Sequence, residues 1–111
     1  MRVIVCGSRD YQDIEAVRTA LRFLPPGTVI VHGGARGADS LADKVAEELG
    51  FSSIEVFRAR WDAEGRAAGV LRNQRMLDSG CDYVIAFPGG RGTADMVCRA
   101  EAAGKLVIRA G

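Results

Sequence analysis

The chain has 111 residues, 48% of them hydrophobic and 26% charged, a composition that excludes a disordered protein and predicts a single domain over residues 1–111. Its formal net charge of +1 argues against a protein that binds nucleic acid mainly through a large basic surface. No apolar run approaches the roughly 20 residues that a membrane-spanning helix needs, and no long hydrophobic leader opens the sequence, so we expect a cytoplasmic protein without a membrane partner.

Side-chain composition narrows the chemistry further. The three cysteines, Cys6, Cys81 and Cys98, are odd in number and lack CxxC spacing, so we expect small buried thiols and neither a disulfide framework nor a zinc site. Only Lys44 and Lys105 among the fifteen basic residues are lysines. The surplus of arginine favours a phosphate or carboxylate ligand, because the planar guanidinium fork matches such groups, although GC-rich coding produces the same bias.

The first half of the chain alternates strand-like and helix-like segments. Residues 2–6 (RVIVC) predict a strand covered on both faces, because β-branched residues follow one another without polar alternation. Apolar residues then recur at helical spacing over 14–24, where Pro25 stops the helix. A second strand is expected at 28–32, and a second helix carries apolar residues over 41–49 and ends at a glycine.

The second half repeats the alternation. A strand is expected at 53–57, followed by a helix from about 63 to 79. The run YVIAF at 83–87 predicts the fourth strand and 93–104 the fourth helix. The last strand is expected at 106–109.

This order predicts an α/β protein with a Rossmann-like three-layer fold. Strands that alternate with helices form a parallel sheet, here five-stranded, with helices on both faces. Right-handed crossovers leave few other topologies. In such sheets ligands bind beyond the carboxyl ends of the strands, which is where candidate site residues should be sought.

Three loops that contain glycine and arginine follow predicted strands and should meet at that edge. They are GSRD (7–10), GGARGAD (33–39) and PGGRGTAD (88–95). Glycine lets backbone N–H groups approach an anion, and the N-terminus of the next helix adds positive potential. Taken alone, each loop is better explained as a plain strand-to-helix turn, because a lone glycine motif is a weak signal. Neither GxxxxGK[ST] nor, after the first strand, GxGxxG is present. Three such loops at one edge favour a phosphate-binding site.

Two aromatic side chains have competing interpretations. Trp61 lies in a loop (58–65, RARWDAEG) with arginines but only a late glycine; we expect it to pack in the core or at an interface, with stacking on a base as the alternative. His32 ends the second strand. Because no cluster of ligating side chains has metal-site spacing, we expect His32 to pack there or to make a backbone hydrogen bond.

The same loops resemble a known superfamily. GSRDY, HGGARGADSLAD and FPGGRGTAD are similar to the SLOG superfamily, which joins the DNA-processing protein Smf/DprA with the Lonely Guy (LOG) phosphoribohydrolases. The resemblance is to its small YspA-like, YpsA-related branch, whose further pattern W…G…AG…RN…M reads here Trp61, Gly65, Ala68-Gly69, Arg72-Asn73 and Met76. It covers essentially the whole chain and implies a Rossmann-like domain that binds nucleotides or nucleotide-derived ligands across these loops.

The loops and the resemblance together assign site residues. The expected ligand-binding residues are Gly7, Ser8, Arg9, Gly33, Gly34, Arg36, Gly37, Arg72, Asn73, Gly89, Gly90, Arg91, Gly92 and Thr93. LOG enzymes carry PGGxGTxEE, whereas this chain has Asp95 and Met96 at the two glutamate positions. The catalytic candidates are therefore Asp95 and Arg75, although a carboxylate in the first turn of a helix is favourable without any ligand.

Three functions stay open at this point. The first is a module that binds a nucleotide or a derivative such as an ADP-ribose. The second is a LOG-like enzyme that cleaves the N-glycosidic bond of a nucleoside 5′-monophosphate. The third is an accessory role in DNA processing, which the near-neutral charge disfavours. Met96 favours the first over the second. None of them calls for a metal or a cofactor beyond the nucleotide itself, and the resemblance allows a homodimer.

Overall fold

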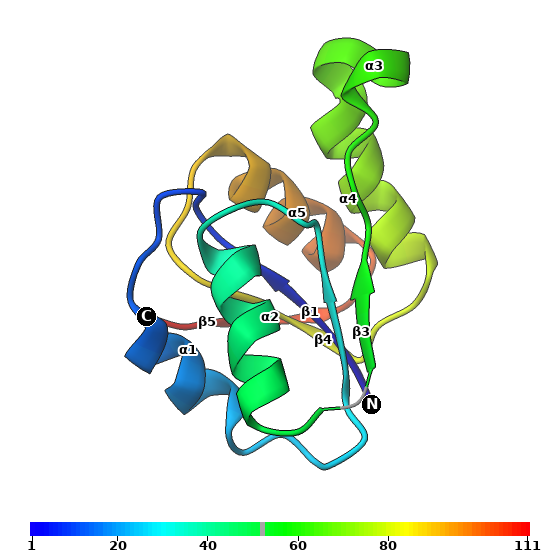
Figure 1. Ribbon diagram of the computed structural model, residues 1–111. Helices are drawn as coiled ribbons and strands as arrows, with labels where there is room; N and C mark the ends of the chain where they lie inside the picture. The colour runs from blue at the N-terminus through cyan, green and yellow to red at the C-terminus, as the bar shows by residue number, and fades with distance from the viewer. Residues whose placement is uncertain (52) are drawn as a thin grey trace.

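The computed structural model describes residues 1–51 and 53–111 and confirms the α/β, Rossmann-like fold. Its five strands form one sheet in the order β3-β2-β1-β4-β5, and every neighbouring pair is parallel (Figure 1). The central position of β1 explains why its residues after Arg2 (VIVC, 3–6) are all apolar and buried. The strands are β1 (Arg2–Cys6), β2 (Val29–His32), β3 (Ser53–Val56), β4 (Tyr83–Ala86) and β5 (Leu106–Arg109).

Helices cover both faces of the sheet, as expected. On one face, α1 (Ile14–Leu21) and α2 (Ala38–Glu48) pack on a core that includes Val3 and Val5 of β1. On the other face, α4 (Ala68–Asp78) and α5 (Arg91–Ala102) pack on a core that includes Ile4. Alternate residues of β1 therefore supply two separate cores, which is why the strand has no polar side.

The third helix departs from the sequence-based expectation. A continuous helix was expected from about 63 to 79, but the structure has a short helix α3 (Trp61–Glu64), a 3-10 turn η1 (Gly65–Ala67) and then α4. Gly65 has φ +57°, a left-handed conformation that glycine adopts without steric cost and that ends α3. The chain consequently turns at this point, and α3 projects beyond the layers of the fold (Figure 1).

Smaller shifts affect other helix ends. The first helix ends at Leu21 instead of Leu24, because the residue before a proline is disfavoured in helical conformation and Leu24 precedes Pro25. The fourth expected helix, α5, starts two residues before the expected position, at Arg91. This earlier start brings the helix N-terminus into the middle of the PGGRGTAD loop.

Burial of the cysteines agrees only partly with the expectation. Cys6 and Cys81 are buried free thiols, and burial raises the pKa of Cys6 to about 12. Cys98 is exposed on α5, so the prediction of a buried thiol is wrong there; its position on the helix faces away from the sheet. Among residues 1–51 and 53–111, none of the helices combines the length and hydropathy that a membrane span requires.

The strand order fixes where a ligand site belongs. The chain runs from β1 outward through β2 to β3, then returns to the other side of β1 as β4. The loops after β1 and β4 therefore diverge in opposite directions at neighbouring strands. A crevice opens at such a reversal in open α/β sheets, beyond the carboxyl ends of the strands.

Candidate functional site

A cavity of about 480 Å³ lies at this reversal, between the loops after β1, β2 and β4 and the first turns of α4. Its size is within the range of small-molecule sites. It brings together ten of the residues that the sequence predicted to bind a ligand: Gly7, Ser8, Arg9, Gly33, Arg72, Asn73, Gly90, Arg91, Gly92 and Thr93.

The other four predicted ligand residues lie outside this cavity. Gly34 and Arg36 line an adjoining cavity on the β3 side, Gly37 lines a shallow depression beside α1, and Gly89 faces the β5 side. The three loops therefore do not present all their glycines to one ligand. Some of these glycines have a different role, in letting the loops touch.

Gly37 and Gly89 allow the loops to approach one another closely. A Cβ on Gly37 would lie closer than 3.0 Å to the backbone of Ser8 and Arg9, and Gly37 also has φ +76°. A Cβ on Gly89 would fall equally close to Thr93 and to the Ser8 nitrogen. Ser8 itself donates its N–H to the Pro88 carbonyl at 2.9 Å and accepts from the Ala38 N–H at 3.1 Å. The loop after β1 is therefore held between the other two.

The N-terminus of α5 forms one wall of the cavity. Its N-cap is Gly90, which offers no side chain to the helix. Among the described residues, the N–H groups of Arg91, Gly92 and Thr93 have no acceptor, as expected for the first turn of an uncapped helix. Three N–H groups and the positive end of the helix dipole make this wall suited to an anion.

In the loop after β2, the backbone N–H groups of residues 33–35 are hydrogen-bonded to side chains of the protein. Asp39 accepts the N–H groups of Gly33 and Ala35 at 3.1 and 3.2 Å, and His32 Nδ1 accepts that of Gly34 at 3.0 Å. The expected backbone hydrogen bond of His32 is therefore present, and its Nε2 lies 2.7 Å from the carboxylate of Asp43.

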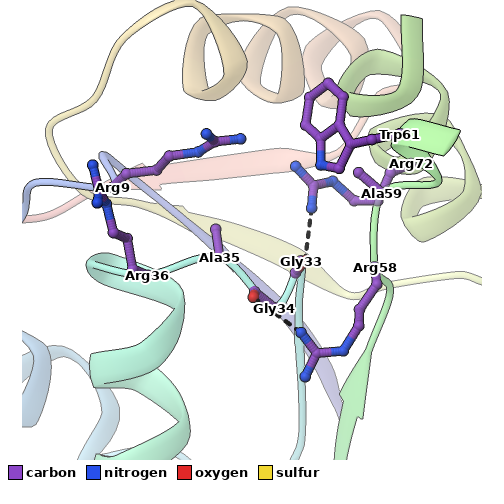
Figure 2. A pocket seen from close by; sticks show the side chains of 9 residues that line it. All are labelled: Arg9, Gly33, Gly34, Ala35, Arg36, Arg58, Ala59, Trp61 and Arg72. Carbon is purple, nitrogen blue, oxygen red and sulfur yellow. Dashed lines mark hydrogen bonds between the residues drawn. The ribbon is translucent and has the colours of Figure 1, made fainter. Parts of the chain in front are cut away.

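The carbonyls of the same loop are held by arginines. Arg72 donates to the Gly33 carbonyl at 2.8 Å and Arg58 to the Gly34 carbonyl at 3.3 Å (Figure 2). A ligand would thus meet guanidinium groups at this loop, instead of the free backbone N–H groups that the glycines suggested. Burial, the largest of several influences, raises the pKa of Asp39 above its usual range.

Asn73 connects α4 to the first turn of α5. The side chain is 4% exposed, and its Nδ2 donates to the Gly92 carbonyl at 3.1 Å and to Asp95 at 3.0 Å. Its Oδ1 accepts from Arg72 Nε at 3.1 Å. Both ends of the amide are therefore bonded to the protein. The residue positions the α5 N-terminus and Arg72, although its edge also lines the cavity.

The two catalytic candidates, Asp95 and Arg75, both bind other side chains of the protein. Both Asp95 oxygens accept from Arg99 Nε, at 2.9 and 3.0 Å, and one also accepts from Asn73. Arg75 forms a salt bridge with Glu64, in which its Nη1 is 3.1 Å from the carboxylate. Neither side chain lines the cavity described above. The structure thus places them in contacts that tie helices together.

Trp61 was expected in the core or at an interface. The structure shows that it does not lie in the core. It is 50% exposed and forms part of the cavity wall, with the guanidinium of Arg9 5.7 Å from its ring centroid. The cause is the break at Gly65, which carries α3 away from the core. The indole lies beside Gly69 of α4, where an added Cβ would be 3.6 Å from the ring, an ordinary van der Waals contact.

The sequence-based analysis missed four charged residues that line the two cavities: Asp10, Asp39, Arg58 and Arg66. Arg58 and Arg66 come from the segment after β3, which has few glycines and so did not match the glycine pattern. Asp39 was taken for an ordinary residue of a first helical turn, yet it is buried and lines the cavity. Arg58 could have been identified from the sequence, because it is one of the arginines of RARWDAEG.

Comparisons with known proteins find one sequence family, a related phage protein and a solved structure of similar fold. The sequence model of the YspA, cpYpsA-related SLOG family (YAcAr) matches residues 1–63. The Gene 61 protein of Mycobacterium phage D29 is 43% identical over 120 residues, which cover 99% of this chain and 96% of the phage protein. DNA processing protein A (DprA) from Streptococcus pneumoniae has a similar fold over 97% of this chain, with a TM-score of 0.80 and 23% identity. This chain spans 49% of that DprA chain.

Proposed function

The chain belongs to the YspA, cpYpsA-related SLOG family, and from this premise we propose that it binds a nucleotide or a nucleotide derivative in the cavity at the carboxyl ends of β1 and β4. The phosphate would lie at the N-terminus of α5, against the N–H groups of Arg91, Gly92 and Thr93. The rest of the ligand would extend toward α4 and Trp61.

One observation carries this proposal: an uncapped helix N-terminus faces a cavity that is also lined by arginines without carboxylate partners. Arg91 and Arg66 line the cavity, and among the described residues neither lies within 4.0 Å of a carboxylate. Free N–H groups and free guanidinium groups both favour a bound phosphate.

The contacts favour binding over hydrolysis. A LOG-like reaction needs a carboxylate near the sugar, and Asp95 is bonded to Arg99 and Asn73. Met96, at the second carboxylate position, is fully buried in the core. The likeness to DprA is a likeness of fold, so a role in DNA processing has no separate support from the site.

A nucleotide panel tests the proposal by thermal shift. A ligand at about 100 times its dissociation constant stabilises the folded state by about 2.7 kcal/mol, which should raise the melting temperature by several degrees. We expect at least one ribonucleotide or dinucleotide to do so, and the matching nucleosides without phosphate to have little effect. Equal shifts from a nucleoside and its phosphate would argue against phosphate as the anchor.

A base-release assay distinguishes binding from hydrolysis. We expect no free base after prolonged incubation of the protein with the common nucleoside 5′-monophosphates, since Asp95 is held by Arg99. Chromatography of the reaction mixture detects the base directly. Release that Asp95→Asn abolishes, while Glu101→Gln on the same helix leaves it intact, would establish the enzymatic alternative instead.

A further inference from the structure

A second cavity, of about 570 Å³, adjoins the first on the β3 side of the sheet edge. Four guanidinium groups line it, from Arg9, Arg36, Arg58 and Arg72, beside the indole of Trp61 (Figure 2). No acidic residue is among its described lining residues. Arg9, Arg72 and Trp61 also line the cavity at α5, so the two cavities share a wall.

What distinguishes the arginines of this wall is that several without a carboxylate partner converge on one cavity. Four other arginines of the described chain pair with carboxylates: Arg2 with Glu55, Arg18 with Glu15 and Glu48, Arg75 with Glu64, and Arg99 with Asp95. In the part of the chain that the structure describes, Arg9, Arg58 and Arg72 have no carboxylate within 4.0 Å. Arg36 lies 3.7 Å from Asp10, and both of these side chains are mostly exposed.

Holding these positive charges together costs free energy in the unliganded protein. Burial lowers the pKa of Arg72, and the nearby charge of Arg9 lowers it further, against the attraction of Asp39. A bound anion offsets such repulsion and takes up guanidinium N–H groups that lack a charged partner. Of the two adjoining cavities, Arg36 and Arg58 line only this one, and Arg91 and Thr93 line only the one at the α5 N-terminus. An anion held by Arg36 and Arg58 would therefore be bound by a different set of residues from an anion at the helix N-terminus.

We propose that the cavity lined by Arg9, Arg36, Arg58 and Arg72 is a second anion subsite, and that the ligand is a nucleotide with two separated phosphate groups. One phosphate lies at the α5 N-terminus and the other among these arginines. The sugar or base between them passes the exposed ring of Trp61. This inference rests on the proposed function and specifies the class of nucleotide.

Titration calorimetry on the full chain tests the second subsite with matched probes. The probes are the common ribonucleoside 5′-monophosphates and the corresponding 3′,5′-bisphosphates. We expect a bisphosphate to bind at least about tenfold more tightly than its monophosphate, because a hydrogen bond to a charged group contributes about 1.5–3 kcal/mol. Arg58→Gln should remove this gain and leave the affinity for the monophosphate unchanged.

Arg60→Gln is the matched control, since Arg60 is an exposed arginine of the same loop that lines neither cavity. It should leave both affinities unchanged. Equal affinities for monophosphate and bisphosphate would overturn the second subsite and leave the first intact. An equal loss of both affinities in Arg58→Gln would also overturn it, by showing that Arg58 acts through the Gly34 carbonyl. Binding of neither class would overturn the proposed function as well.

Discussion

Replacing Gly37 by alanine should lower the free energy of unfolding by about 2–5 kcal/mol, because two penalties combine at this position. Its backbone has φ +76° and ψ −129°, a region in which residues with a side chain are strained. An added Cβ would also collide with the backbone of Ser8 and Arg9, which cannot move like the end of a flexible side chain. Chemical denaturation measures the loss.

Gly50→Ala provides the control at the other end of α2. Gly50 also has a positive φ, of +78°, but a Cβ there would meet nothing within 4 Å. Only the conformational penalty remains, about 1–2 kcal/mol. If Gly37→Ala destabilises the protein no more than Gly50→Ala, the close approach between the loops after β1 and β2 does not constrain the fold as described.

Arg72→Gln should have the largest effect on ligand binding, with a weakening on the order of a hundredfold, since it removes a guanidinium from the wall that both cavities share. It should also destabilise the unliganded protein by about 1–3 kcal/mol, because the Gly33 carbonyl and the Asn73 amide lose their donor. Calorimetric titration and denaturation measure the two effects separately.

Two further variants separate charge from geometry at Arg72. Arg72→Lys keeps the charge without the planar fork and should recover only part of the affinity. Arg22→Gln removes an exposed charge just beyond α1, away from both cavities, and should change neither binding nor stability appreciably. A hundredfold loss in Arg22→Gln would show that overall charge, and not the site, controls affinity.

The sheet was predictable because its strands are short, apolar and β-branched. In β1 every residue after Arg2 is apolar and buried, and such a run without polar alternation identifies a parallel strand without any knowledge of its neighbours. The edge where the ligand site lies followed from the same argument, since parallel strands place their carboxyl ends together. Family membership was likewise recognisable from the loop motifs.

The side-chain contacts within the site were not predictable in the same way. Asn73 and Asp95 both lie in motifs that suggested ligand contact, yet they bond to each other across two helices. Sequence spacing shows that two residues can reach one edge of a sheet; it does not show whether they meet a ligand or one another. Trp61 was misplaced because a single glycine, Gly65, ends α3 where helical periodicity appeared to continue.

The central claim is that a nucleotide phosphate binds at the N-terminus of α5, and calorimetric titration of wild-type and Arg91→Gln protein tests it most directly. Arg91 is exposed, lines the cavity and has no carboxylate partner among the described residues, so its replacement should leave the fold intact. We expect at least one common ribonucleotide to bind one-to-one, and Arg91→Gln to weaken it by about ten- to hundredfold. Absence of binding by every nucleotide, or equal affinities of the two proteins, would contradict the account.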